Sequence, residues 1–369
     1  MPVRIGLAFN LKPSLPVSAE IAAKADATRN PRHARRALHP ELAQPDLYAE
    51  WDEPETIDAV ERALCALGEV IRLEADASFP ARLLEARPDF VFNIAEGLYG
   101  PNREGHVPAI CEYFGIPCHA SDPLTCALTL HKGRTKEILT QYGVPTAPFA
   151  VVESRAAARR VRLPYPLFAK PALEGSGKGI TTRNLCQTPA ELSALVGDLL
   201  TAYRQPVLVE QYLPGQEFTV AVLGNGDTAE CLPIVGLRFD CLPDGAPPIY
   251  GYEAKWLWDT MERPLEIYEC PARISEDLAA EVRRVSLAAY RALGCRDWCR
   301  IDVRCDATGQ PNVVELNPLP GILPDPRDNS CFPMAARVAG MSYDQLIQSV
   351  ADIAWRRISG RRLQRAEAA

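Results

Sequence analysis

The stretch that decides the fold reads WCRIDVRCDATGQPNVVELNPLPG and runs from Trp298 to Gly321. Turn-forming residues separate two runs that are rich in β-branched side chains, which predicts two strands joined by a turn. Successive side chains in a strand point to opposite faces, so each strand is expected to have a polar face. The polar face of the first strand is expected to carry Arg300, Asp302 and Arg304. The same face of the second strand is expected to carry Val313, Glu315 and Asn317.

Where the two polar faces coincide, they bring together the side-chain oxygens of Asp302, Glu315 and Asn317. Such oxygen ligands suit Mg²⁺, which proteins usually hold by one or two carboxylates and which substrate phosphates complete. Prolines then stop the second strand abruptly, and Gly321 is free to bring its backbone N–H close to a ligand. An ordinary amphipathic hairpin with a hydrated polar face is the alternative. The metal interpretation requires phosphate-binding groups elsewhere in the chain.

Length and composition describe a globular protein of two or three domains. The chain has 369 residues, of which 24% are charged and 47% hydrophobic. The net charge of −7 argues against nucleic acid as a partner, and no apolar run reaches the length of a membrane span. No signal peptide is visible, so a cytoplasmic location is expected. The twelve cysteines show no zinc-binding pattern and are expected to be small buried thiols.

The first 120 residues predict a parallel sheet, because strand and helix patterns alternate in the order β-α-β-α-β. The strands are expected at 3–9, 69–73 and 90–94, and the helices at 57–68 and 79–87. A segment at 11–49, rich in proline, alanine and arginine, is expected to be a flexible surface insert. Open α/β sheets bind ligands at the carboxyl ends of their strands. Glu96, Arg103 and Glu104 follow the third strand, so we expect them to contact a substrate.

A second unit is expected to begin with one helix at 122–143, which has proline just inside its start. Farther along, the loop EGSGKGI at 174–180 lacks the residues of a Walker A loop, and no helix opens after it as in a dinucleotide fingerprint. We expect a hairpin tip whose backbone N–H groups close over phosphates, with a plain flexible turn as the alternative. Lys170 favours the phosphate interpretation, because a half-buried lysine on an apolar strand needs an anionic partner.

The other elements mix strands and helices. Strands are expected at 149–152, 167–171, 207–210, 217–223 and 233–239. Helices are expected at 190–203 and 276–293, and two more helices close the chain.

Taken together, these motifs resemble the ATP-grasp ligases, and the D-alanine–D-alanine ligases most closely. The resemblance covers roughly residues 121–353 in unbroken order and is weaker before them. It is carried by Lys132; FAKP at 168–171 with EGS at 174–176; VEQYL at 209–213; EFTV at 217–220; YEAK at 252–255; RIDV at 300–303; and ELN at 315–317 with Pro320-Gly321. The resemblance implies an α/β ATP-grasp fold, α+β in its C-terminal part. It places an N-terminal parallel-sheet domain at 1–125 and two ATP-binding lobes at 126–214 and 215–369.

The resemblance also implies a role for each matching residue. ATP phosphates would be held by Lys132, Lys170 and Lys255, and the glycine loop would contribute Glu174, Gly175 and Ser176. The adenine slot would be lined by Glu210, Gln211, Tyr212 and Leu213, and the ribose hydroxyls would be bound by Glu217. Magnesium, expected as two ions that Mn²⁺ can replace, would be held by Asp302, Glu315 and Asn317. The catalytic residues would be Arg300, Ser176, Gly321 and Lys255, with Arg300 and the Gly321 N–H at the developing oxyanion.

Several departures from the family pattern bear on the substrate. The motif with a glutamate that opens the related ligases is absent, and Glu50, Glu53 and Glu55 are the candidates to replace that glutamate. Trp256 stands where the relatives have tyrosine. Extra residues at 323–329 precede Ser330, which occupies the position where the relatives bind the acceptor's carboxylate. These departures predict that D-alanine is not preferred at both substrate positions.

The activity that the resemblance implies is ATP-dependent ligation of a carboxylate to an amine. ATP would convert the carboxylate to an acyl phosphate, and the amine would then displace phosphate to leave an amide and ADP. The expected partners are small carboxylate and amine substrates, such as amino acids or biosynthetic metabolites, and a homodimer is one option for the assembly. A housekeeping D-alanine–D-alanine ligase is one alternative. A non-catalytic ATP-binding protein is the other, but it would have no need to retain the full set of lysine, arginine and carboxylate side chains.

Overall fold

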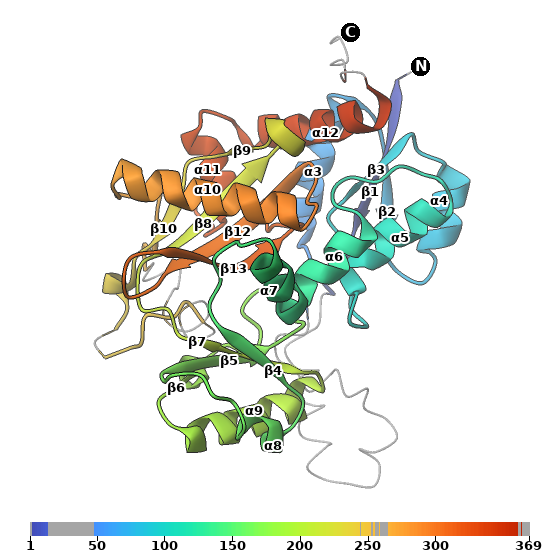
Figure 1. Ribbon diagram of the computed structural model, residues 1–369. Coiled ribbons are helices and arrows are strands. Elements are labelled where there is room, and N and C mark those ends of the chain that lie inside the picture. The colour runs from blue at the N-terminus through green and yellow to red at the C-terminus, as the bar shows by residue number, and fades with distance from the viewer. Residues whose placement is uncertain are drawn as a thin grey trace, which may run out of the picture.

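The computed structural model describes residues 2–13, 48–243, 245–251, 254, 258, 265–360 and 363. The strands within these ranges form three sheets, and Figure 1 shows helices packed against them. Most of the insert expected at 11–49 lies outside the described residues. Among the described residues, no helix is long and apolar enough to cross a membrane.

The first sheet is parallel, as the alternating pattern predicts. Its strands lie in the order β2-β1-β3. The elements are β1 (Val3–Phe9), α3 (Pro54–Cys65), β2 (Gly68–Glu74), α4 (Phe79–Ala86) and β3 (Phe90–Asn93). The chain continues from β3 into the 3₁₀ turn η2 (Arg103–Gly105) and helix α5 (His106–Tyr113). The predicted substrate residues therefore follow the carboxyl end of this sheet.

The single helix expected at 122–143 is in fact two helices, α6 (Pro123–Leu130) and α7 (Lys132–Gln141). The break falls at His131, whose ψ of 87° is not helical and whose Nδ1 accepts a hydrogen bond from the backbone N–H of Arg134. A histidine cap therefore starts a new helix in a stretch that has no proline to signal the break. The predicted start of the first helix, with proline in its first turn, is confirmed.

The second sheet is antiparallel and carries the glycine loop. Its strands lie in the order β4-β7-β5-β6, and two helices pack on one face (Figure 1). The elements are β4 (Phe149–Val152), α8 (Arg155–Ala158), β5 (Leu167–Pro171), β6 (Leu185–Cys186), α9 (Pro189–Tyr203) and β7 (Val207–Gln211). The loop joins β5 to β6, which confirms a hairpin. A 3₁₀ turn, η3 (Thr182–Asn184), shortens the returning strand to two residues.

The third sheet is also antiparallel, with β9 paired to β8 beside the order β11-β10-β8-β12-β13. The strands are β8 (Glu217–Leu223), β9 (Glu230–Cys231), β10 (Val235–Leu237), β11 (Tyr268–Glu269), β12 (Trp298–Cys305) and β13 (Pro311–Asn317), and helix α10 (Glu276–Ala292) packs on one face. The strand expected at 233–239 is shorter. Pro233 cannot donate a ladder hydrogen bond, and the 3₁₀ turn η5 (Phe239–Cys241) ends the extended segment.

The polar face of the β12–β13 hairpin differs from the predicted one at Val313. A β-bulge follows Asp302, so Asp302 pairs with Glu315 while Val303 pairs with Val313. Val313 is fully buried in the core, and Val314 lines a cavity beside Glu315. The prediction that Val313 shares a face with Glu315 is therefore wrong, because a bulge adds one residue and reverses the alternation beyond it.

The core of the first sheet extends into the last two helices, α11 (Cys331–Val338) and α12 (Tyr343–Ser359). Buried side chains from β1, α3, α11 and α12 form one cluster, and Figure 1 shows α12 beside α3. The two ends of the chain therefore fold against each other.

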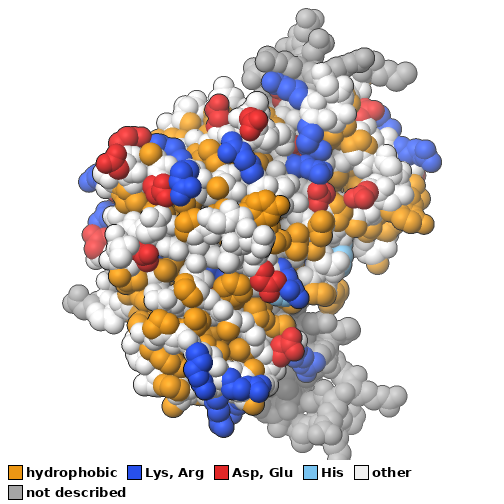
Figure 2. All heavy atoms as spheres, viewed as in Figure 1, with side chains coloured by type: hydrophobic (Ala, Val, Ile, Leu, Met, Phe, Trp, Pro, Cys, Tyr) orange, Lys and Arg blue, Asp and Glu red, His pale blue; other side chains and the backbone are white. Residues whose placement is uncertain are grey.

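Charged side chains of both signs are scattered among hydrophobic and uncharged ones on the face shown in Figure 2, and basic side chains gather at the lower end of the lobe that carries α8 and α9. Arg155, Arg159 and Arg160 are exposed on this lobe. The twelve cysteines all lie in the described part of the chain, and none forms a disulfide; seven are buried as expected, but Cys65 is exposed.

Candidate active site

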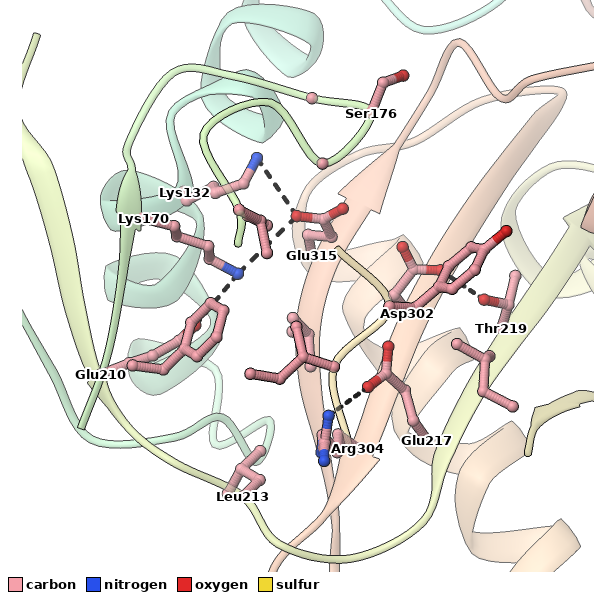
Figure 3. Close-up of a pocket in the computed structure, with 18 of the residues that line it drawn as sticks. Lys132, Lys170, Ser176, Glu210, Leu213, Glu217, Thr219, Asp302, Arg304 and Glu315 are labelled. Atoms are coloured by element: carbon pink, nitrogen blue, oxygen red, sulfur yellow. Dashed lines mark hydrogen bonds and ion pairs between the residues drawn. The ribbon is translucent and has the colours of Figure 1, made fainter. Parts of the chain in front are cut away.

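One cavity between the second and third sheets gathers most of the predicted site residues. Its volume is about 1220 Å³, including the part open to solvent. Figure 3 shows side chains from both sheets and the glycine loop around this space. The predicted residues that line it are Lys132, Lys170, Glu174, Gly175, Ser176, Glu210, Gln211, Tyr212, Leu213, Glu217, Arg300, Asp302 and Glu315.

Two buried lysines and a carboxylate lie together in this cavity. The Nζ atoms of Lys132 and Lys170 are 3.3 and 4.0 Å from Glu315 Oε2 (Figure 3). Burial would raise the pKa of Glu315, but the charges of Lys132, Lys170 and Arg300 outweigh this effect and hold the pKa well below its usual range. Lys132 also donates a hydrogen bond to the backbone carbonyl of Glu174 in the glycine loop. The cluster therefore offers ammonium groups to an anion and an ionised carboxylate to a cation.

Glu210 binds a lysine on each carboxylate oxygen. Lys136 Nζ is 2.7 Å from one oxygen, and Lys170 Nζ is 3.1 Å from the other. Burial would raise the pKa of Glu210, but these two charges lower it. Glu210 thus orients Lys170, a residue predicted to bind phosphate, in addition to lining the cavity. Sequence reasoning missed Lys136, although its position one helical turn after Lys132 is a signal that could have found it.

The hairpin brings the three predicted metal ligands to one place. Asp302 lies opposite Glu315 in the strand register, and the Asn317 amide is 3.4 Å from Asp302 Oδ2. Thr219 Oγ1 donates to Asp302 Oδ1 at 2.9 Å, and Arg300 Nη2 donates to Asp302 Oδ2 at 2.9 Å. Two carboxylates and an amide beside buried lysines form a donor set that fits Mg²⁺ completed by phosphate oxygens.

At another end of the cavity, Glu217 pairs with an arginine. Arg304 Nη1 donates to Glu217 Oε2 at 2.6 Å (Figure 3). Arg304 Nη2 donates to Tyr212 Oη at 2.8 Å. Sequence reasoning placed Arg304 on the polar face of its strand but gave it no role. The missing information was the β8–β12 register, which sets Arg304 opposite Glu217.

The glycine loop is tied to the N-terminal part of the chain through Glu50. The Glu50 carboxylate accepts hydrogen bonds from Gly175 N at 3.0 Å, from Lys178 Nζ at 2.6 Å and from Arg103 Nη2 at 3.0 Å. Arg103 and Lys178 also pair with the Glu174 carboxylate, at 3.6 and 3.1 Å. Glu50 is thus the one of the three candidate glutamates that the structure places against the loop. Sequence reasoning missed Lys178 as an anchor, because its partner Glu50 lies 128 residues away in the sequence.

The predicted substrate residues Glu96 and Glu104 are carboxyl groups that interact electrostatically with Glu50 and Arg103. Glu104 is only 8% exposed, and burial, partly offset by Arg103, raises its pKa to about 7. Burial and the charges of Glu104 and Glu50 raise the pKa of Glu96 well above its usual range. Within the described part of the chain, neither carboxylate has a hydrogen-bond partner.

The structure describes only part of the region predicted to bind the acceptor substrate. Ser330 Oγ donates to the Gly321 carbonyl at 3.0 Å and accepts from Leu323 N at 3.1 Å, so it closes the loop after β13. Ser330, Gly321 and the other substrate contacts of this loop stay predictions. Lys255 and Trp256 lie outside the described residues.

Comparison with known proteins finds a matching family and similar sequences. The family model described as D-ala D-ala ligase C-terminus matches residues 138–352. A D-alanine–D-alanine ligase of Bordetella petrii is 37% identical over 278 residues, which cover 73% of this chain and 77% of that protein. The uncharacterised protein y4sG of Sinorhizobium fredii is 36% identical over 331 residues, which cover 87% of this chain and 92% of that protein.

Two solved structures share the fold. D-alanine–D-alanine ligase from Bacillus anthracis complexed with ATP has a TM-score of 0.61 at 21% identity, and the match covers 96% of this chain and 98% of that one. The VanG D-Ala:D-Ser ligase from Enterococcus faecalis has a TM-score of 0.66 at 19% identity, with 96% and 100% covered.

The fold and the site define an ATP-grasp ligase, an ADP-forming enzyme that joins a carboxylate to an amine. The chain belongs to the D-alanine–D-alanine ligase family. Enzymes of this family use ATP and Mg²⁺ and act on small molecules, and the predicted α/β ATP-grasp fold is confirmed.

Proposed function

We propose that this ligase joins amino acids or small biosynthetic metabolites, and that D-alanine is not preferred at both positions. The observation that carries the proposal is the engagement of Glu50, which already binds Arg103, Lys178 and the glycine loop. A carboxylate that two cations neutralise has little attraction left for the amino group of a small substrate. Glu96 and Glu104 are nearby carboxyl groups without hydrogen-bond partners among the described residues, and a substrate ammonium group would supply the positive charge that lowers their raised pKa and lets them bind it ionised.

The reaction has two steps in this proposal. The carboxylate of the first substrate attacks the γ-phosphorus of ATP, ADP leaves and an acyl phosphate forms. The amine of the second substrate then attacks the acyl carbon and loses a proton, and inorganic phosphate leaves as the amide forms. Water must be kept from the acyl phosphate, and the glycine loop tied down through Glu50 would provide that cover.

The chain's own cations supply most of the charge stabilisation. Lys132 and Lys170 would bind phosphate oxygens, and Arg300, beside Asp302, would face the oxyanion that develops on the acyl group. Mg²⁺ held by Asp302, Glu315 and Asn317 would add positive charge at the transferring phosphoryl group. Two Mg²⁺ ions, substitution by Mn²⁺ and a homodimer belong to the same proposal; activity titrated against each metal and sedimentation of the protein would test them.

The test is an ADP-release screen with D-alanine alone, with pairs of D- and L-amino acids and with bulkier carboxylates. We expect a donor–acceptor pair that gives a higher kcat/KM than D-alanine alone. The Asp302→Asn enzyme is the background control, because ATP hydrolysis by any contaminant persists in it.

A housekeeping D-alanine–D-alanine ligase is the second candidate, and the 37% identity to the Bordetella petrii enzyme favours it. If D-alanine alone exceeds every other pair in kcat/KM, this candidate replaces the first. A chain that releases no ADP above background with any pair would contradict both.

A further inference from the structure

The Arg304–Glu217 pair lies at the end of the cavity that the phosphate-binding lysines do not reach. Figure 3 shows the pair beside Leu213, away from Lys132 and Ser176. On the paired strands β8 and β12, Glu217 lies opposite Arg304, and Thr219 lies opposite Asp302 two residues away. Two residues of a strand span about 7 Å, so the pair is one such step from the metal ligand Asp302.

Arg304 is bound on several sides. Its Nη1 donates to Glu217 Oε2 at 2.6 Å, and its Nη2 donates to Tyr212 Oη at 2.8 Å and to the Pro248 carbonyl at 2.9 Å. The guanidinium carbon lies 4.9 Å from the centre of the Tyr212 ring and 5.1 Å from that of Phe239. Because these contacts come from four separate segments, the guanidinium group is held in one place, and Glu217 with it.

Arg304 is only 7% exposed, and its Nε is a buried donor for which no acceptor is found among the described residues. Buried donors are normally satisfied, so this orphan indicates that a ligand or water supplies an acceptor here. Apolar side chains line the neighbouring wall of the cavity: Leu213, Leu237 and Ile249. The combination of an apolar wall, a fixed carboxylate and an unsatisfied donor suits a nucleoside rather than a phosphate group.

A carboxylate only accepts hydrogen bonds, so a ligand group that faces Glu217 must be a donor. In a nucleotide, the vicinal hydroxyl groups of ribose are the donors that lie between the base and the phosphates. We propose that Arg304 is a positioning residue that fixes Glu217 against the ribose hydroxyls and thereby sets the preference of the enzyme for ribonucleotides. This inference rests on the proposed use of ATP and assigns a role to a residue that the family resemblance leaves without one.

The test is calorimetric binding of ADP and of 2′,3′-dideoxy-ADP, each with Mg²⁺, so that no acyl substrate is needed. We expect the wild type to bind ADP at least about tenfold more tightly than the dideoxy compound, the factor for one lost charge-assisted hydrogen bond. Arg304→Met should bring the two affinities within about threefold of each other, and Arg304→Lys should restore part of the difference. A purely structural role would weaken both nucleotides equally and would leave their ratio unchanged.

Arg238→Met is the matched control, because Arg238 is an exposed arginine that pairs with Asp240 outside the cavity. It should keep the wild-type ratio. A ratio that survives in Arg304→Met, or a wild type that does not distinguish the two nucleotides, overturns the proposal while leaving ATP use intact. If Arg304→Met does not fold, the ratio of the ADP and dideoxy-ADP affinities is compared between Arg304→Lys and the wild type. A smaller ratio in Arg304→Lys supports the proposal, and an equal ratio overturns it. A wild type that binds neither nucleotide contradicts the proposed function itself.

Discussion

Asp302 and Glu315 are the residues on which the metal assignment depends. We expect Asp302→Asn and Glu315→Gln each to lower kcat by about 100-fold or more, equivalent to roughly 2.7 kcal/mol, because each removes a charge that a bound metal needs. The melting temperature should stay close to that of the wild type. Steady-state ADP release at several Mg²⁺ concentrations measures the loss. Asp240→Asn, an exposed carboxylate paired with Arg238, is the control, and normal turnover in either site variant would disprove the assignment.

Lys170 lies between Glu210 and Glu315, which makes it the best-placed residue for a test of phosphate binding. We expect Lys170→Ala to raise the Kd of ATP by about 10- to 100-fold, since a charge-assisted hydrogen bond contributes about 1.5–3 kcal/mol. The fold should persist, because Glu210 keeps its partner Lys136. Calorimetric titration of ATP measures the change, with Lys12→Ala as control, because Lys12 pairs with Glu53 and does not line the cavity. An unchanged Kd would mean that Lys170 only neutralises its two glutamates.

Single residues were predictable where a charged side chain stands out against the pattern of its strand. A lysine on an apolar strand and carboxylates at every second position of a hairpin are visible in the sequence, which is why Lys170, Asp302 and Glu315 were found. The partners of Glu50 and Arg304 were not, because they depend on contacts between segments 53 to 128 and 56 to 92 residues apart.

At the scale of elements, most strands were predictable within two residues, but two irregularities were not. The bulge after Asp302 reverses the alternation that the prediction assumed, and no glycine marks it. The helix break at His131 depends on one side-chain cap, which the apolar spacing of both helices conceals. Both irregularities lie beside the cavity. Departures from regular secondary structure are expected at functional sites, because the site requires a particular local geometry.

The glycine loop offers a test at this scale. Glu50→Gln removes the charge that holds Arg103 and Lys178 together, so the backbone amides of 174–180 should exchange hydrogen faster, by about tenfold or more. Hydrogen exchange followed by mass spectrometry measures this rate. Glu53→Gln is the matched control, because Glu53 forms a surface ion pair with Lys12. Equal loop exchange in Glu50→Gln and the wild type would show that the Glu50 contacts do not hold the loop.

At the scale of the whole molecule, the sequence predicts the N-terminal parallel sheet, and the family resemblance implies two ATP-binding lobes, but neither indicates how these parts assemble. The parallel sheet at the amino terminus shares its core with α11 and α12, although more than 200 residues separate them. The division into domains at 1–125, 126–214 and 215–369 stays a prediction, and the shared core shows that the first and last parts depend on each other for burial.

The buried carboxyl group of Glu104 gives this assembly a predictable response to pH. Burial raises its pKa to about 7 against the attraction of Arg103, with Glu50, Lys132 and Lys178 also acting on it. The folded state therefore holds a proton that the unfolded state releases above its ordinary pKa of 4.5. Between these two values, the free energy of unfolding should fall as pH rises, by up to about 1.4 kcal/mol per pH unit for this group.

Glu104→Gln keeps the shape of the protonated side chain but cannot ionise. It should therefore match the wild type near pH 4.5 and become the more stable of the two as the pH rises to 7.5. Urea unfolding at pH 4.5, 5.5, 6.5 and 7.5 measures the difference. Asp52, whose pKa burial also raises to about 7, keeps its own contribution in both proteins. The charge of Glu104 raises the pKa of Glu96, so the difference between the two proteins measures Glu104 together with its effect on Glu96. Glu112→Gln, an exposed change on α5, should run parallel to the wild type. If Glu104→Gln also runs parallel, Glu104 is ionised in the folded protein, and it then carries a full negative charge for a substrate ammonium group.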